Sequence, residues 1–502
     1  MPYPKYRVLV NSPQRGKSVR HDAALARGPL YGRKRDATFR AMTQTVAVPL
    51  WLLILILLFA AVTFASHFLF PSVRWFFRKR MERGVARLNE RLARPIQPFK
   101  LAARHDTIER LIYHPSVTEA VVEHARREDV PEAVAFQQAR KFAREIVPSF
   151  SATVYFTIGT RLAKWISRAM YRIRLGAADR EVLDRIDPEA AVVFVMNHRS
   201  NMDYVLVTYL VARASALSYA VGEWARVWPL SPMIRAMGAY FIRRQDRGRL
   251  YRRVLARYVQ MATEGGVTQA FFPEGGLSLD GRLAAPKLGI LSYIIEGFQP
   301  GQRDVVFVPV GLNYDRVLED RFLIRAGESG ERKFRPPWGA VAGGVAYHLW
   351  LRITRRFEGF GTAAVRFGEP LSLAQFLAGR EGPPVEAVGQ EIMRRLARVV
   401  PVLAVPLCAR ALAEGEGTRA AVVARMEDML VTLAGRGVHV PRGGAGAMAE
   451  RALAQFLRRG VVERDGEVLR VVAGQEGVVR YYANTIAHHF ADAAEDAALA
   501  KQ

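Results

Sequence analysis

The feature that most constrains the fold is an alternation of short apolar runs with helical stretches between residues 190 and 314. The runs are rich in the β-branched and aromatic residues that favour strands. They are AAVVFVM (190–196), ALSYAV (216–221), GAYFIRR (238–244), VTQAFFPEG (267–275) and DVVFVPVGLNY (304–314), and TAAVRFGEPLSL (362–373) is one more candidate. Helical stretches such as GRLYRRVLARYVQMATEG separate them. The pattern predicts an α/β fold with a mixed, largely parallel sheet flanked by helices.

The regions on either side have a different pattern. Upstream, VTEAVVEHARREDVPEAVAFQQARKFAREIV has apolar residues at spacings of three and four, which is typical of helices, and the chain beyond about residue 385 is again rich in Ala, Arg and Leu. We therefore expect a basic N-terminal tail (1–45), a membrane anchor (46–70), a helical region (71–185), the α/β domain (186–380) and a helical C-terminal region (381–502).

The anchor is expected because residues 46–70, VAVPLWLLILILLFAAVTFASHFLF, contain no Asp, Glu, Lys or Arg. A helix needs about 20 such residues to cross the hydrocarbon core of a bilayer. A secretory signal peptide has a shorter apolar core and does not follow more than 40 residues of polar, basic chain. A buried core helix and a re-entrant hairpin remain alternatives.

Basic residues flank the apolar segment on both sides, and the C-terminal flank, RWFFRKRMERGVARLNERLAR, is the denser one. This flank favours the cytoplasmic side of the cell inner membrane for the C-terminal portion, against anionic phospholipid headgroups. The alternative is that these arginines only solvate an exposed helix face.

The net charge restricts the class of partner. The chain has 73 Lys plus Arg against 47 Asp plus Glu, a formal charge of +26, which favours nucleic acid, anionic lipid or a phosphorylated or acidic substrate. Near the C-terminus, LRRGVVERDGEVLRVV predicts a hairpin that turns at Asp465 and Gly466, so a winged-helix nucleic-acid-binding module is one reading. No zinc-finger or basic-zipper pattern accompanies the arginines, so we regard nucleic acid as an unfavoured partner.

Cysteine and histidine usage argues against a metal site. Cys408 is the sole cysteine, which excludes a disulfide framework and a cysteine-rich zinc site, and its apolar setting favours packing over catalysis. His488 and His489 are adjacent in a helical stretch and point to different faces, which makes them a poor ligand pair. We expect no metal.

Polar residues follow the predicted strands, at the sheet edge where the functional groups of α/β proteins gather. His198 and Asp203 follow the first strand, in FVMNHRSNMDYVLV. Across the connecting turn Asp203 can orient the His198 ring and leave one nitrogen free as a general base for acyl transfer to a hydroxyl. The structural alternative is that Ser200 caps the next helix with Asp203 completing a capping box, and both readings can hold together.

A second set of residues suits an anionic group. Arginine and lysine bind phosphate, and consecutive glycines allow the backbone to approach it. The candidates are Arg243, Arg244, Arg282, Lys287, Gly275 and Gly276. Surface ion pairs and a simple turn are the alternatives for them. Ser278 is not a nucleophile, because GLSLDG lacks the G-x-S-x-G turn.

With these residues in hand, the chain strongly resembles the glycerolipid acyltransferase superfamily, in particular the bacterial membrane-associated glycerol-3-phosphate acyltransferases. HRSNMDY resembles the H-x-x-x-x-D block, GAYFIRR the second block, FPEGGLSLDGR the third and VFVPVGLNYD the fourth, in the family's order and spacing. ARKFAREIVPSF, FGEPLSL and YYANTIAHHF resemble flanking regions, so the likeness covers roughly residues 135–490.

The resemblance implies that 186–380 is an acyltransferase domain with His198 as base and Asp203 as its partner. It places the acceptor near Arg199, Ser200, Arg243, Arg244, Glu274, Gly275, Gly276, Ser278, Arg282 and Lys287. The implied reaction moves a fatty acyl group from acyl-CoA or acyl carrier protein to the sn-1 hydroxyl of glycerol 3-phosphate in phospholipid synthesis, with no cofactor.

The third block departs from the family pattern. Leu277 and Leu279 stand where the family usually has an arginine, and FPEG is more typical of lysophosphatidate acyltransferases. Acylation of 1-acylglycerol 3-phosphate is therefore the alternative activity, and Arg282 and Lys287 are expected to compensate for the missing charge. A non-catalytic basic scaffold that binds membrane or nucleic acid is a third reading.

Overall fold

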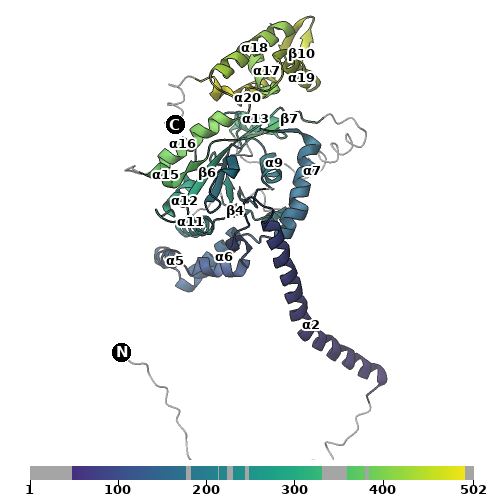
Figure 1. Cartoon of the computed structure of the whole chain (residues 1–502), viewed down its shortest axis with the longest axis vertical. Helices are drawn as coiled ribbons and strands as arrows, with labels where there is room; N and C mark the ends of the chain where they lie inside the picture. The colour runs from purple at the N-terminus through teal and green to yellow at the C-terminus, as the bar shows by residue number, and fades with distance from the viewer. Residues whose placement is uncertain are drawn as a thin grey trace, which may run out of the picture. The chain divides into compact units, whose positions relative to one another are not determined.

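The computed structural model describes residues 48–176, 182–212, 214–222, 230–243, 248–330, 359–378, 384–415 and 417–491 (Figure 1). The chain divides into two compact units, Met1–Met81 and Glu82–Gln502.

The first unit contains most of helix α2 (Leu50–Asn89). The described side chains at its start are large, apolar and exposed, with Leu50 at 73% and Phe59 at 71%. Among the described residues, no single helix is long and apolar enough to cross a membrane, and only a bent pair, α16 (Pro384–Val399) with α17 (Ala404–Ala413), meets that test at an angle of 92°. The anchor over 46–70 stays a prediction, because residues 46 and 47 and the side chains beyond Thr63 are outside the described set.

The second unit is built on an eight-stranded sheet with the order β1-β7-β6-β2-β5-β3-β4, in which β8 pairs with β6. Pairing is parallel throughout except for β6 with β7 and β6 with β8. The strands are β1 (Arg172–Leu175), β2 (Ala191–Met196), β3 (Ser218–Gly222), β4 (Tyr240–Ile242), β5 (Gln269–Phe271), β6 (Val305–Tyr314), β7 (Thr362–Phe367) and β8 (Leu371–Ser372). The prediction of a mixed, largely parallel α/β sheet is confirmed.

Both faces of the sheet are covered, which explains why its central strands are continuous apolar runs. Alternate residues of β2 enter two different cores: Phe194 lies in one, and Val193 and Val195 lie in the other. The Val193 side packs against α4 (Arg104–Ile112), α5 (Pro115–Glu128), α6 (Glu132–Ile146), α11 (Arg249–Glu264), α12 (Gly289–Glu296) and α16. The Phe194 side packs against α9 (Met202–Val211) and the C-terminal helices α17, α18 (Arg419–Gly435), α19 (Ala445–Arg458) and α20 (Glu476–Asn484).

The remaining elements are short or lie at the edges of this arrangement. They are α3 (Pro98–Leu101), η1 (Val154–Gly159), α7 (Thr160–Met170), α10 (Leu230–Ala236), α13 (Asp320–Ser329), α15 (Leu373–Leu377) and η3 (Ala487–His489). The sheet begins with β1, before the boundary predicted at residue 186 and inside a region expected to be helical. Its RIRL sequence alternates exposed and half-buried residues, as expected of an edge strand.

The C-terminal region is not purely helical, since it contains a second sheet with the order β10-β11-β9. The predicted hairpin is confirmed as β10 (Val462–Asp465) and β11 (Val468–Val471), and β9 (Gly417–Thr418) pairs with β11. The turn lies one residue later than expected, at Gly466 and Glu467, because Asp465 still pairs with Val468. Gly466 has φ +61°, the left-handed conformation that glycine adopts readily.

Candidate active site

The turn after β2 carries His198 and is held to the neighbouring strand by Asn197. The Asn197 amide donates to the Leu312 carbonyl at 2.9 Å, and its oxygen accepts the Leu312 N–H at 2.7 Å. Asn197 therefore mimics a strand residue for β6 just where β2 has ended. This pairing positions the following residue, His198, over the carboxyl end of the sheet.

His198 and Asp203 form the predicted pair. Nδ1 of His198 lies 2.9 Å from Oδ2 of Asp203, and the two side chains are 4% and 0% exposed. Asp203 is in the first turn of α9, and among the described residues nothing hydrogen-bonds to Nε2 of His198. With Nδ1 protonated and held by the carboxylate, Nε2 is left with its lone pair available as a base.

The same carboxylate also shapes the turn, as the capping-box reading of this motif predicts. Oδ2 of Asp203 accepts the backbone N–H groups of Arg199 at 2.8 Å and Ser200 at 3.0 Å. Oγ of Ser200 accepts the Met202 N–H at 3.1 Å, which satisfies one of the free donors at the start of α9.

Tyr314 is a site residue that the sequence reasoning did not assign. Its hydroxyl donates to Oδ1 of Asp203 at 2.6 Å from the last position of β6. Burial raises the pKa of Tyr314 well above its ordinary value, so the hydroxyl stays protonated as a donor. The only signal in the sequence was its position at the end of an apolar run.

Two aromatic rings fix the plane of the imidazole. Phe272 stacks on His198 with ring centroids 3.8 Å apart and an interplanar angle of 16°. Tyr204 meets the edges of both rings, at 5.6 Å from His198 and 5.0 Å from Phe272. These contacts restrict rotation of the imidazole, and Phe272 excludes water from the face on which it stacks.

Glu274 ties the loop after β5 to this turn. One oxygen accepts the backbone N–H of His198 at 3.0 Å and the other accepts that of Ala284 at 3.3 Å. Burial raises the pKa of Glu274 to about 7, against the opposing effect of the nearby Arg199 charge. The contacts of Glu274 are those of a residue that positions His198.

Glycine suits position 275 because its backbone there is in the left-handed conformation. Gly275 has φ +70°, and a Cβ there would lie 2.6 Å from Cδ of Lys287. Gly276 follows in the same turn and is partly exposed. The turn therefore presents backbone and one exposed lysine side chain, as expected for an edge that receives an anion.

Ser278 organises the loop that follows. Its N–H donates to the His198 carbonyl at 3.0 Å, and its hydroxyl donates to the Arg282 carbonyl at 2.8 Å. The hydroxyl oxygen also accepts the Gly281 N–H at 3.1 Å. Through these bonds Ser278 joins the ends of its own loop and links that loop to the turn that carries His198.

The predicted basic residues lie in different settings. Arg199 is fully buried and donates from one Nη to the Arg282 carbonyl at 3.0 Å, while the Arg282 side chain is 59% exposed near Asp280. Arg244 lies outside the described residues. Ser200, which was expected to bind substrate, donates its hydroxyl to Glu319 at 2.7 Å.

Arg243 is not brought together with His198. Its guanidinium pairs with Glu145 of α6 at 2.7 Å and lies over the rings of Phe142 and Tyr251, at 5.0 Å and 5.4 Å. Both aromatic residues belong to the core on the Val193 side of the sheet, whereas His198 stacks on Phe272 of the other core. These contacts tie the residue after β4 to α6 and α11.

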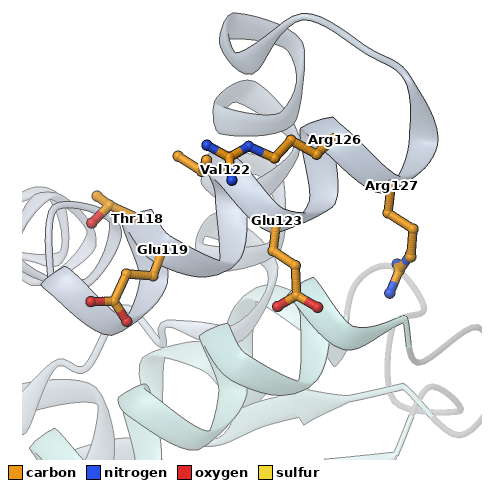
Figure 2. Close-up of a pocket in the computed structure, with 6 residues that line it drawn as sticks. All are labelled: Thr118, Glu119, Val122, Glu123, Arg126 and Arg127. Atoms are coloured by element: carbon orange, nitrogen blue, oxygen red, sulfur yellow. The ribbon is translucent and has the colours of Figure 1, made fainter.

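Two surface hollows lie elsewhere. One is lined by residues of α5 alone, which Figure 2 shows as Thr118, Glu119, Val122, Glu123, Arg126 and Arg127. The other lies beside Arg243 and includes Lys141 and Tyr251. Neither is lined by His198 or Asp203. Among the described residues, no group of three or more His, Cys, Asp or Glu side chains is placed to hold a metal ion.

Comparison with known proteins gives two family matches. The family described as Acyltransferase matches residues 179–313, which include His198, Asp203 and Glu274. The family described as Glycerol-3-phosphate acyltransferase C-terminal region matches residues 350–501, which include α20.

Curated relatives extend the likeness over most of the chain. Glycerol-3-phosphate acyltransferases of Actinobacillus succinogenes and Pasteurella multocida are 27% and 28% identical over 78% of this chain, and that of Shewanella baltica is 27% identical over 91%. The chain spans 50% to 60% of the length of these relatives. Among solved structures, a 1-acyl-sn-glycerophosphate acyltransferase from Thermotoga maritima is 18% identical, with a TM-score of 0.30 over 48% of this chain and 74% of that one.

Proposed function

Because the chain belongs to the acyltransferase family and carries the C-terminal region of the glycerol-3-phosphate acyltransferases, we propose that it acylates the sn-1 hydroxyl of glycerol 3-phosphate. The acyl donor is a thioester, acyl-CoA or acyl carrier protein, and the product is lysophosphatidate for phospholipid synthesis. The observation that carries the proposal is the buried His198–Asp203 pair, whose Nε2 has no hydrogen-bond partner among the described residues.

The geometry supports a general-base mechanism. Nε2 of His198 takes the proton of the acceptor hydroxyl while that oxygen attacks the thioester carbonyl carbon. The tetrahedral intermediate expels the thiolate, which takes the proton from His198, so an ester and a free thiol result. Asp203 keeps Nδ1 protonated and stabilises the imidazolium that forms between the two steps.

The acceptor's phosphate needs cationic partners. Lys287 and Arg282 are exposed around the turn at Gly275, and Arg199 is adjacent in sequence to the base. The side chains of Leu277 and Leu279 pack against the core, so they leave the loop without the arginine that the family usually has there. We propose that Lys287, Arg282 and Arg199 supply the positive charge, with Gly276 leaving room for the anion.

The second candidate activity is acylation of 1-acylglycerol 3-phosphate. The FPEG sequence and the two leucines favour it, because a reduced positive charge suits an acceptor that is held partly by its acyl chain. Purified full-length chain with one labelled acyl donor and both acceptors separates the two activities. A preference for glycerol 3-phosphate in kcat/KM is expected, and a preference for the lysolipid overturns the first proposal.

The non-catalytic scaffold is tested by His198→Ala. The substitution removes the proposed base, so acylation of either acceptor falls to background while membrane association is retained. His105→Ala is the matched control, because the His105 side chain is 81% exposed and lies outside the catalytic turn. Turnover that survives His198→Ala contradicts the assignment of the base.

We also propose that the apolar start of α2 binds the chain to the bacterial inner membrane, with the second unit on the cytoplasmic side. The support is the exposure of large apolar side chains such as Leu55 at 56% and Leu58 at 64%. Leu55→Arg combined with Leu58→Arg should move the chain from the membrane fraction to the soluble fraction. Val134→Arg, at a position of α6 that is 50% exposed, is the control that should not.

A further inference from the structure

Helix α20 of the C-terminal region packs against the loop at Asp280 and Gly281, next to the candidate site. The amide of Asn484 donates to the Asp280 carbonyl at 2.9 Å. Gly281 lies so close to α20 that a Cβ at this position would be 2.0 Å from the Tyr481 carbonyl oxygen. The loop from Ser278 to Arg282 therefore contacts the His198 turn through Ser278 and helix α20 through Gly281.

Arg199 and Tyr481 both lie against this loop, and each has a donor without a hydrogen-bond partner among the described residues. Arg199 is 0% exposed, and in the described part of the chain its Nε and second Nη have no hydrogen-bond partner. Tyr481 is 1% exposed, and no described residue hydrogen-bonds to its hydroxyl. An unsatisfied buried donor is costly, and more so when it is charged, so two such side chains at one loop point to a missing acceptor.

Nearby carboxylates do not supply that acceptor. Asp203 is occupied by His198, two backbone N–H groups and Tyr314. Glu274 accepts two backbone N–H groups, and Glu319 accepts from Ser200 and Asn201. None forms a hydrogen bond with the Arg199 guanidinium, so no carboxylate of a described residue is hydrogen-bonded to this charge.

The guanidinium of Arg199 and the hydroxyl of Tyr481 are both available as donors. The charge of Arg199 lowers the pKa of Tyr481, but burial dominates and raises it, so the hydroxyl stays protonated. His488 lies in the same environment, where burial, His489 and Arg199 together hold its pKa well below the ordinary value. A planar guanidinium and a hydroxyl with no competing carboxylate match the oxygens of a phosphate group.

We propose that Arg199 and Tyr481 form one anion-binding pocket for the phosphate of the acceptor, so that the C-terminal region completes the acceptor site. This inference rests on the proposed function. The acceptor is favoured over the donor because Arg199 directly follows the base His198, and the phosphates of an acyl donor lie at the far end of the pantetheine arm from its thioester.

Tyr481→Phe tests the pocket, since it removes one hydroxyl and preserves the ring. The KM for glycerol 3-phosphate should rise about tenfold while the KM for the acyl donor stays within twofold. Tyr219→Phe is the matched control: it removes another buried hydroxyl, one that is 2.8 Å from Oγ1 of Thr208 and outside the pocket, and should leave both KM values unchanged. Arg199→Lys is the second variant and should also raise the acceptor KM.

A binding measurement separates this pocket from the proposed function. Inorganic phosphate should raise the Tm of the full-length wild-type chain and of Tyr219→Phe, and raise that of Tyr481→Phe much less. If the wild-type chain acylates glycerol 3-phosphate and Tyr481→Phe changes neither its KM nor the phosphate-dependent Tm, the pocket is overturned and the function stands.

Two other outcomes are equally decisive. A rise confined to the donor KM assigns the pocket to a donor phosphate and overturns the acceptor assignment. A wild-type chain that acylates neither acceptor overturns the proposed function, and the phosphate-dependent Tm then decides on the pocket by itself.

Discussion

The hydroxyl of Tyr314 donates to Oδ1 of Asp203 at 2.6 Å, while Oδ2 of the same carboxylate lies 2.9 Å from Nδ1 of His198. Each oxygen of Asp203 therefore has a separate task. Oδ2 orients the imidazole and the turn, and Oδ1 links α9 to the end of β6. The orientation of the proposed base thus depends on two elements that are far apart in the sequence.

Tyr314→Phe should lower kcat about tenfold and leave both KM values nearly unchanged. The loss of one hydrogen bond to a buried charged group frees the carboxylate to rotate away from His198. Steady-state kinetics with both substrates measures the effect. Tyr171→Phe is the control, because its hydroxyl donates to the Arg316 carbonyl although its ring packs 5.3 Å from that of Tyr314. An unchanged kcat for Tyr314→Phe means that His198 and the backbone N–H groups of Arg199 and Ser200 are enough to hold Asp203 in place.

Glu274→Gln should flatten the pH dependence of stability. Burial raises the pKa of Glu274 from 4.5 to about 7, so between these values the folded state binds a proton that the unfolded chain has released. The free energy of unfolding therefore falls as the pH rises through this window, by about 3 kcal/mol in total, and is level above it.

Urea unfolding of wild type and variant between pH 5 and 8 measures this difference. Glu128→Gln is the control, because its side chain is 49% exposed. If the free energy of unfolding of the wild-type chain rises from pH 5 to pH 7 relative to that of Glu274→Gln, the pKa of Glu274 is not raised.

Gly281→Ala should destabilise the chain by more than about 3 kcal/mol, since a Cβ there would overlap the Tyr481 carbonyl at 2.0 Å in addition to the strain of φ +88°. Gly301 has a similar φ of +84° but open space around it, so Gly301→Ala should cost only about 1 kcal/mol. Urea midpoints of the two variants separate backbone strain from the contact with α20. Equal losses of stability in Gly281→Ala and Gly301→Ala would show that the close contact between Gly281 and Tyr481 adds nothing to the cost of the substitution.

Arg282→Gln and Lys287→Gln should each raise the KM for glycerol 3-phosphate about two- to fivefold at low salt. Both side chains are exposed, so their attraction for a phosphate is screened and the effect should shrink at high ionic strength. Kinetics at two salt concentrations measure it. An unchanged KM for both variants removes these residues from the acceptor site.

The sequence pattern predicted strands such as β2 and β6, which are buried on both faces. Such strands are continuous apolar runs, because both sets of alternating side chains lie in a core. They missed β1, where only half the positions are buried and RIRL has no such run. His198 and Asp203 were found because one short turn carries both.

Tyr314 was not assigned, since nothing local shows that its hydroxyl crosses to α9. Nothing local to GAYFIRR shows that the Arg243 guanidinium pairs with Glu145 of α6, and the role of Arg243 in the acceptor site stays a prediction.

The contact between Asn484 and Asp280 joins residues that are 204 positions apart. During synthesis at about 5–20 residues per second, the loop at Asp280 leaves the ribosome about 10 to 40 s before α20 exists to cover it. A nascent chain that has not yet reached α20 therefore carries the His198–Asp203 turn with one side of its site open, and the site is completed only once α20 has been made.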